Sequence, residues 1–278
     1  MHDQDSADPT LTLSNPLSEA VSARDRDILS MVNTAIRKKR VLMAFQPVIQ
    51  TARPDHMAFH EGLIRVLDHN GRIIPAREFI GVVENQELGR ELDVLSLEIG
   101  LETLAKVPDL RLSINMSARS IGYPKWKRSL LRGLAKDATI AERLILEITE
   151  ATAITIPEIV QVFMKDLQMK GVSFALDNFG AGFTALQYLR DFYFDILKID
   201  GSFTKNIHAC PDNRAITRAI LAMANALEMF TVAQNVETYA DASVLADLGA
   251  DCMQGYYFGA PTVSPYWLKT ASRRRKAG

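Results

Sequence analysis

Strand-length apolar runs alternate with longer helical stretches along most of this chain. The helical stretches, such as 87–107 and 212–229, carry apolar residues at i, i+3 and i+4. The runs between them are apolar almost throughout, which is typical of parallel strands covered on both faces. The alternation predicts an α/β fold with strands at 110–116, 143–149, 172–177, 195–200, 230–236 and 251–258.

Two further β-rich runs, 41–49 and 57–66, precede this pattern. They are separated by the turn-like QTARPD, which predicts an antiparallel hairpin rather than a strand–helix unit. With the hairpin the chain has eight predicted strands, and eight is the number that closes a (β/α)8 barrel. An open doubly wound sheet is the alternative, although no G-x-G-x-x-G turn follows the first strand as a dinucleotide fold requires.

The chain is expected to form one domain between two short tails. Its 278 residues, 47% of them hydrophobic, suffice for one large core. Residues 1–24 are expected to be disordered or variable, because the first twenty or so are polar, acidic and poor in large apolar groups. Residues 25–268 form the predicted domain. Residues 269–278 form a basic tail, for which a solvated segment is the simplest interpretation.

Charge and composition exclude several classes of partner. A formal net charge of −1 provides no field that would recruit DNA or RNA. No apolar run approaches the ~18 residues that a transmembrane helix needs, and the N-terminus lacks the pattern of a signal peptide. Two cysteines are too few for a disulfide framework. The expectation is a soluble, cytoplasmic protein without a transmembrane segment.

Polar residues recur at one place in the pattern, inside or at the carboxyl ends of the predicted strands. In a barrel these ends meet at one mouth, where catalytic groups come from several strands. Seven strands supply such residues, which makes a shared site the best interpretation. The residues are Glu61, Asn115, Glu147 with Glu150, Asp177, Lys198 with Asp200, Glu237 and Gln254.

Each residue also has a simpler interpretation. A lone Glu61 in a strand is more often a half-exposed surface residue, and Asn115 is equally compatible with the start of a loop. Asp177 and Asp200 could cap the helices that follow, an alternative that is stronger for Asp200. Lys198 lies inside the apolar DILKID, and lysine is almost never buried without a partner.

The combination of carboxylates, an amide and a lysine points to phosphodiester chemistry. Carboxylate and amide oxygens are hard ligands, which favour Mg²⁺ or Mn²⁺, with Ca²⁺ also possible, over zinc. A lysine beside them would neutralise charge on a phosphoryl group or orient a water molecule. Two-metal hydrolases also need anionic ligands that bridge both cations.

Seven motifs in order resemble the signature of the EAL family, whose members are cyclic di-GMP phosphodiesterases and receptors. They are HEGLIR (60–65), SINMS (113–117), LEITE (146–150), LDNFGAGF (176–183), LKID (197–200), VAQNVET (232–238) and MQGYYFGAP (253–261). The resemblance covers residues 25–268. It implies a modified TIM-like (β/α)8 barrel with an antiparallel first strand.

The resemblance also implies roles for individual residues. Lys198 matches the lysine that positions the catalytic water, and Glu150 matches a glutamate that stabilises the DNFGAG loop. Glu237 and Gln254 match polar residues of the active-site rim. The protein ligands of the first metal are matched by Glu61, Asn115, Glu147 and Asp177, and the ligand-binding positions are Gln46, Arg65, Asp200 and Gln254, with Arg65 expected to bind phosphate.

The departures from the family pattern fall on the second metal. Active members resembling this chain carry aspartate at the position of Asn178, and glutamate followed by glycine at Gln234 and Asn235. Both carboxylates are thus replaced by neutral amides of similar shape, which offset no metal charge. The sequence therefore predicts a degenerate member in which a single cation binds more readily than two.

Three functions follow, in order of preference. The first is a receptor that binds cyclic di-GMP, is catalytically impaired, and passes the signal to an unidentified protein partner. The second is an active Mg²⁺- or Mn²⁺-dependent phosphodiesterase that opens cyclic di-GMP to pGpG, slowed by Asn178 and Gln234. The third is a protein-interaction module that binds neither metal nor nucleotide. The resemblance further implies a homodimer.

Overall fold

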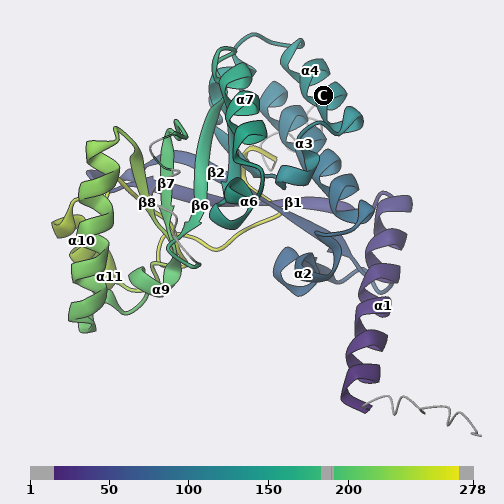
Figure 1. The fold of residues 1–278 in the computed structure, drawn as a ribbon, viewed down its shortest axis with the longest axis horizontal. Helices are drawn as coiled ribbons and strands as arrows, with labels where there is room; N and C mark the ends of the chain where they lie inside the picture. Colours follow the sequence, from purple (N-terminus) through teal and green to yellow (C-terminus); the bar gives the residue numbers. More distant parts are fainter. Residues whose placement is uncertain (1–15, 183–188, 190, 269–278) are drawn as a thin grey trace, which may run out of the picture.

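The computed structural model describes residues 16–182, 189 and 191–268, and nine strands form one sheet (Figure 1). The basic tail and residues 1–15 lie outside the described residues. The strands are β1 (Val41–Gln50), β2 (Arg53–Leu67), β3 (Ile73–Pro75), β4 (Leu112–Asn115), β5 (Leu144–Thr149), β6 (Ser173–Phe179), β7 (Ile196–Ile199), β8 (Phe230–Ala233) and β9 (Cys252–Met253).

Eight of these strands close a barrel, as predicted. The order is β1-β9-β8-β7-β6-β5-β4-β2, and the ring closes because β1 also pairs with β2. Strand β1 is antiparallel to both of its neighbours, whereas β2 and the strands from β4 to β9 run parallel. The antiparallel first strand expected from the hairpin is confirmed. Strand β3, which was not predicted, extends β2 outside the ring.

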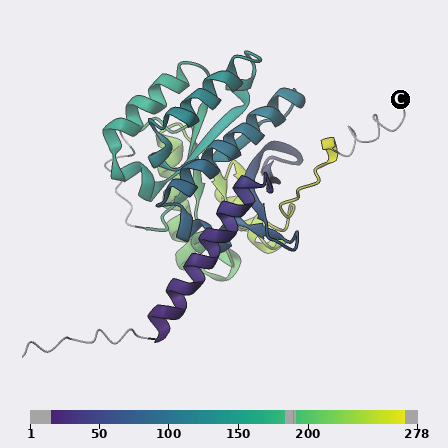
Figure 2. The ribbon, with the colours of Figure 1, turned by 90° about the vertical axis from the view of Figure 1, so that its right-hand side faces the viewer.

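Helices surround the barrel, and α1 runs away from it in both views (Figures 1 and 2). None of the described helices is long and apolar enough to cross a membrane. The α-helices are α1 (Pro16–Arg37), α2 (Ile80–Val83), α3 (Glu87–Lys106), α4 (Pro124–Leu134), α5 (Ile140–Arg143), α6 (Glu150–Thr155), α7 (Pro157–Gln168), α9 (Gly201–Thr204), α10 (Pro211–Ala226) and α11 (Tyr239–Leu248); 3-10 turns lie at Ala76–Glu78, Ala118–Ser120 and Ile207–Ala209.

Two boundaries differ from the expectation. Helix α1 begins at Pro16, so residues 16–24 of the segment expected to be disordered are helical. Strand β9 ends at Met253, although the apolar pattern extends to residue 258. The reason lies in the backbone, because Tyr257 N donates to Val236 O at 3.2 Å and the chain turns over the end of β8. The strand predicted from the continuous apolar run is therefore longer than the one observed.

Apolar residues pack against both faces of the barrel sheet, the inner and the outer. Inside it, Val48, Phe59, Ile145, Ala175, Ile196 and Val232 form a buried cluster, one residue from each of six strands. Outside it, a larger cluster packs the strands against the helices, with Trp126 of α4 and Phe174 of β6 fully buried. The inner cluster is the floor on which the polar residues described next are placed.

Candidate functional site

The polar residues at the strand ends form one layer above the apolar floor. Successive side chains of a strand point to opposite faces, so a residue two positions after a floor residue also points inward. Glu61 follows Phe59 in this way, and Glu147 follows Ile145. The register agrees, because Asn115 lies opposite Glu147 in the β4–β5 pair. The same relation places Asp177, Lys198, Gln234 and Gln254 in the layer.

Lys198 lies at the centre of this layer and contacts three carboxylates. Its Nζ lies 2.7 Å from Glu147 Oε2, 3.1 Å from Glu61 Oε2 and 3.1 Å from Asp177 Oδ1. The lysine side chain is 0% exposed, so water cannot share in solvating the ammonium. The paired, buried lysine expected from DILKID is thus observed, and its partners come from β2, β5 and β6.

Amide side chains satisfy the remaining carboxylate oxygens of Glu61. Asn115 Nδ2 donates to Glu61 Oε1 at 2.9 Å, and Gln254 Nε2 donates to Glu61 Oε2 at 2.6 Å. Gln254 also donates to Gln46 Oε1 at 3.3 Å. Both oxygens of Glu61 therefore have donors without a metal, and Asn115 acts here as a donor rather than as an oxygen ligand.

The side-chain amides of Asn178 and Gln234, at positions where the family resemblance implies carboxylates, both donate to Asp177. Asn178 Nδ2 lies 3.0 Å from Asp177 Oδ2, and Gln234 Nε2 lies 2.9 Å from Asp177 Oδ1. Asn178 and Asn235 have φ of 55°, in the left-handed region that asparagine tolerates better than most residues. Asn235, at a position where the resemblance implies glycine, therefore has a backbone conformation that glycine also adopts readily.

The layer contains more carboxylates than positively charged groups. Burial favours the neutral amine of Lys198, but Asp177, Glu147 and Glu61 outweigh this effect and raise its pKa well above the usual value. Burial, together with repulsion from Glu61, raises the pKa of Glu147 to about 8. With all four groups ionised, three carboxylates and one ammonium carry a formal charge of −2. The site attracts either a proton or a cation.

One carboxylate oxygen of the layer has no hydrogen-bond partner in the part of the chain that the structure describes. Glu147 Oε1 is buried and has no hydrogen-bond partner among the described residues, so it is free to bind a cation. The other carboxylate oxygens of Glu61, Glu147 and Asp177 already accept hydrogen bonds from Lys198 or from amides, which leaves them less available to a cation. Within the described ranges no group of three or more His, Cys, Asp and Glu side chains is arranged to hold a metal. Asn178 and Gln234 supply no charge for a second ion.

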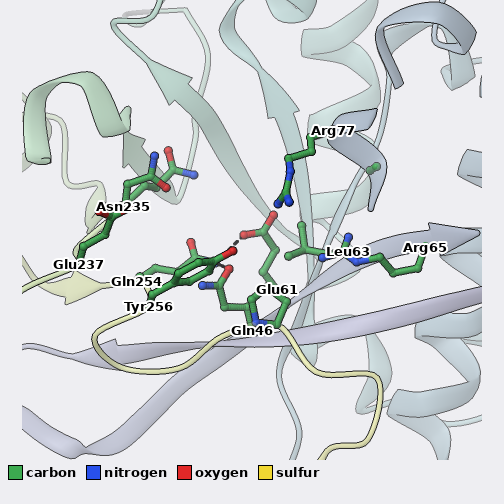
Figure 3. Close-up of a pocket in the computed structure, with 13 residues that line it drawn as sticks. Gln46, Glu61, Leu63, Arg65, Arg77, Asn235, Glu237, Gln254 and Tyr256 are labelled. Atoms are coloured by element: carbon green, nitrogen blue, oxygen red, sulfur yellow. Dashed lines mark hydrogen bonds between the residues drawn. The ribbon is translucent and has the colours of Figure 1, made fainter. Parts of the chain in front are cut away.

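A pocket of about 330 Å³ lies above the layer (Figure 3). Figure 3 shows Glu61 at its centre, Asn235 and Glu237 on one side, and Leu63 and Arg65 on the other. The predicted residues that line it are Gln46, Glu61, Arg65, Gln234, Glu237 and Gln254. The barrel mouth therefore brings most of the predicted site together.

Arg77 also lines this pocket and was not predicted. It lies in the 3-10 turn after β3, inside the PAREFI segment (75–80), and Figure 3 shows it reaching toward Glu61. Burial and the nearby charge of Arg77 lower the pKa of Arg65. Among the described residues Arg77 has no carboxylate partner. Two guanidinium groups at one pocket form a site for an anion. A cation just after a short strand is a weak signal, and the sequence offered no stronger one.

Two predicted residues lie beside the pocket rather than in it. Glu150 Oε2 accepts a hydrogen bond from Gly180 N at 3.2 Å, the contact expected of a residue that holds the DNFGAG loop. Asp200 caps α9, because its Oδ1 accepts from Ser202 N at 2.9 Å. The helix cap considered as the alternative for Asp200 is the one observed, and its assignment as a ligand contact stays a prediction.

Comparison with known proteins gives a consistent result. The family model described as EAL domain matches residues 29–261. The cyclic di-GMP phosphodiesterase PdeF of Escherichia coli (strain K12) is 32% identical over 243 residues, covering 85% of this chain and 32% of the relative. The cyclic di-GMP phosphodiesterase PdeB of Shewanella oneidensis is 31% identical, covering 82% and 27%. The chain thus spans about a third of the length of these relatives.

Solved structures share the fold. The PaMucR phosphodiesterase in complex with c-di-GMP has a TM-score of 0.77 and 26% identity, covering 85% of this chain and 97% of that one. The FimX EAL domain from Pseudomonas aeruginosa bound to c-di-GMP has the same TM-score and coverage at 24% identity. The barrel with an antiparallel first strand is therefore an architecture that these structures also have.

Proposed function

The chain belongs to the EAL domain family, and from this premise we propose that it binds cyclic di-GMP in the pocket above Lys198 and hydrolyses it slowly or not at all. One observation carries the proposal. Both oxygens of Asp177 accept hydrogen bonds from amides, Oδ2 from Asn178 and Oδ1 from Gln234, where active members have carboxylates. Amide donors stabilise Asp177 without a metal, and they offer no charge that would hold a second cation.

The pocket supports binding of a phosphate-containing ligand. Arg65 and Arg77 would form charge-assisted hydrogen bonds to the phosphates. Gln46 and Gln254 would provide neutral polar contacts, and Tyr256, 62% exposed at the pocket, would provide a face for stacking on a base. The anionic layer beneath would repel a phosphate, and this is the reason a cation between them would strengthen binding.

A single Mg²⁺, Mn²⁺ or Ca²⁺ would be held by Glu61, Asn115, Glu147 and Asp177. Its charge would neutralise the formal −2 of the layer and polarise a phosphate oxygen. Asn115 would contribute its amide oxygen, which requires the opposite orientation of the amide from the one that donates to Glu61. Glu237 at the rim would then remain paired with Lys205, whose Nζ lies 3.1 Å from Glu237 Oε2.

An active phosphodiesterase that produces pGpG is the second candidate. The observation that favours it is the orphaned Glu147 Oε1 beside an otherwise complete set of first-metal residues and Lys198. The relatives PdeF and PdeB carry names of active enzymes. In this case Asn178 and Gln234 would reduce the rate without abolishing it.

The experiment is isothermal titration of cyclic di-GMP into the protein, first with a chelator and then with Mg²⁺ or Mn²⁺, followed by chromatography of the mixture. Binding without pGpG is the expected result for a receptor that passes the signal to a protein partner. Formation of pGpG at the rate of active relatives would favour the enzyme. Absence of binding in every condition would overturn both and leave a protein-interaction module.

A further inference from the structure

A second pocket, which we call the basal pocket, lies at the end of the barrel opposite the mouth. Its volume is about 500 Å³, within the range of about 300–1,000 Å³ that is typical of small-molecule sites. Its lining includes residues at the amino ends of the parallel strands, such as Ile145 of β5, Ile196 of β7 and Phe230 of β8. No described residue lines both this pocket and the one above Lys198. The basal pocket is therefore separate from the proposed cyclic di-GMP site.

The apolar floor beneath the polar layer is also the ceiling of the basal pocket. The floor residues that line it are Phe59, Ile145, Ile196 and Val232. Each of them is followed two residues later by a member of the polar layer, so the floor separates the two pockets. The basal pocket therefore offers a buried apolar surface to a ligand, and this surface does not depend on the polar layer.

Phe230 provides an exposed aromatic ring at this end of the barrel. It is the first residue of β8 and is 66% exposed, and the alternation of the strand places it on the same inner face as Val232. Asp195 and Asp251 come directly before β7 and β9, the two strands that pair with β8, and both line the pocket. The start of β8, with its aromatic ring, thus lies between two carboxylates.

Each of these two carboxylates has one oxygen without a partner. Asp195 Oδ2 accepts from Phe174 N at 2.8 Å, and Asp251 Oδ2 accepts from Thr231 N at 2.8 Å. The Oδ1 atom of each aspartate accepts no hydrogen bond and forms no ion pair with any residue that the structure describes. Asp251 is exposed and Asp195 is half-buried, so both Oδ1 atoms can pair with a cation from solution.

The other two charged residues of the basal pocket offset each other. They are Arg111, which comes directly before β4, and Glu142 of α5, which precedes β5. With Asp195 and Asp251 included, three carboxylates and one guanidinium carry a formal charge of −2. A phosphate or carboxylate ligand would be repelled by this charge, whereas a cation would be attracted.

We propose that the basal pocket binds a small organic cation, in which an ammonium group is attached to an apolar body. The ammonium would lie between Asp195 and Asp251 at the face of Phe230, where cation–π attraction adds to the pairing of charges. The apolar body would pack against the floor residues Ile196 and Val232. A neutral ligand of the same shape would leave both aspartates unpaired and would therefore bind more weakly.

The first test titrates wild-type protein with hexylamine, which is cationic at pH 7 as lysine is, and with 1-hexanol and hexanoate as neutral and anionic comparisons. In the NMR spectrum of methyl-labelled protein, hexylamine is expected to shift the signals of Ile145, Ile196 and Val232, and to leave that of Leu63 at the mouth unchanged. It is also expected to bind about tenfold more tightly than either comparison. Equal affinities for the three probes, shifts confined to Leu63, or no shift of the floor methyl groups would overturn the proposal.

The second test removes the charges and keeps the hydrogen bonds. In the double variant Asp195→Asn with Asp251→Asn, the amide oxygens can still accept from the backbone, and hexylamine affinity is expected to fall about tenfold. The matched control is Asp212→Asn with Asp247→Asn, because both residues are exposed on α10 and α11 and neither lines the pocket.

Unchanged affinity in the first double variant, with folding intact by circular dichroism, would overturn the proposal, and so would an equal loss in the control. The comparison of the three probes on wild-type protein decides the point if the double variant does not fold. The titrations contain no cyclic di-GMP, so their outcome is independent of whether the proposed function is correct.

Discussion

Gln234 donates a hydrogen bond from Nε2 to Asp177 Oδ1 over 2.9 Å, and this bond connects the residue after β8 to β6, two strands that lie on either side of β7. A glutamate at position 234 would place a second negative charge at this distance, and a cation or a shared proton would be needed to offset the repulsion. The amide removes that requirement. At the mouth of this barrel both oxygens of Asp177 therefore have donors without a metal.

Restoring both carboxylates should restore the second metal. We expect Asn178→Asp combined with Gln234→Glu to raise pGpG formation at least tenfold in Mn²⁺, because anionic ligands would then offset the charge of a second ion. The metal-free variant should lose about 1–3 kcal/mol of unfolding free energy, since donors to Asp177 become repelling charges. Chromatography and urea denaturation, with and without Mn²⁺, measure the two effects.

The control for this variant is Gln234→Ala, which removes the donor without adding charge. It should lower stability by a similar amount but produce no gain in turnover. If wild-type protein already matches the double variant in rate, the assignment of Asn178 and Gln234 as the cause of impairment is wrong.

Lys198 should be the largest single contributor to the stability of the layer. Lys198→Met removes the ammonium that contacts three buried carboxylates and should cost about 3–5 kcal/mol, the range for breaking a buried ion pair. Added Ca²⁺ should recover part of this loss if Glu61, Glu147 and Asp177 hold a cation. Urea denaturation with and without Ca²⁺ measures both.

Lys205→Met provides the comparison, because Lys205 pairs with Glu237 where both side chains are about half exposed. Such surface pairs contribute about 0–1 kcal/mol. Equal losses from the two variants would show that Lys198 is not the organising charge of the site.

Much of this site could be predicted because the functional side chains follow the two-residue alternation of the strands. Glu61, Glu147 and Lys198 each lie two residues after an apolar floor residue, so the sequence spacing alone places them on the inner face. Lysine inside an apolar run also required anionic partners. The topology then followed from the hairpin at 41–66, which made the first strand antiparallel.

Other features depend on geometry that spacing does not contain. Arg77 reaches the pocket from a turn after β3, a three-residue strand too short to produce a pattern. Asp200 lies one residue after β7, where a helix cap and a ligand contact have the same sequence signature. The hydrogen bond from Asn178 to Asp177 depends on a left-handed backbone at Asn178. Asparagine tolerates this conformation but does not require it, so the sequence alone does not predict the bond.

Arg77 should contribute to ligand affinity. Arg77→Gln is expected to weaken cyclic di-GMP binding by about 1–3 kcal/mol, or roughly ten- to a hundredfold, because it loses charge-assisted hydrogen bonds to phosphate. Arg72→Gln is the control, since Arg72 is exposed beside Asp68 in the same hairpin region and does not line the pocket. Titration calorimetry of both variants decides the point, and equal affinities would remove Arg77 from the site.

Asp93 of α3 should make stability depend on pH. Burial raises its pKa from 3.8 to about 6, although Ser120 Oγ and Ser117 N donate to its carboxylate at 2.6 and 3.0 Å. Between pH 4 and 6 the native carboxyl holds a proton that the unfolded chain has lost. Its stabilising contribution is thus complete below about pH 4 and is lost as pH rises through 6.

The comparison with Asp93→Asn isolates this effect. From pH 4 to pH 7 the wild type should lose about 1–3 kcal/mol relative to the variant, since two pKa units correspond to about 3 kcal/mol. His60 has the opposite sign, because burial lowers its pKa to about 4, but its contribution is common to both proteins and cancels. Urea denaturation at several pH values measures the difference, and a constant difference would contradict the assignment to Asp93.

Replacement of Gly180 in the DNFGAG loop should be destabilising for two separate reasons. Its φ is +90°, and an added Cβ would lie 2.5 Å from the Phe203 ring. Gly71, with φ of +81° and no described atom within 4 Å of an added Cβ, isolates the backbone effect. Gly71→Ala should cost about 1–2 kcal/mol of unfolding free energy from strain alone, and Gly180→Ala about 2–4 kcal/mol, because overpacking adds to the strain.

Gly180→Ala should also affect the ligand. Since Gly180 N donates to Glu150, this variant should release the loop beside Asn178 and weaken cyclic di-GMP binding. Equal stability losses for the two variants would mean that Phe203 moves aside easily, and unchanged binding would mean that the loop conformation does not support the pocket.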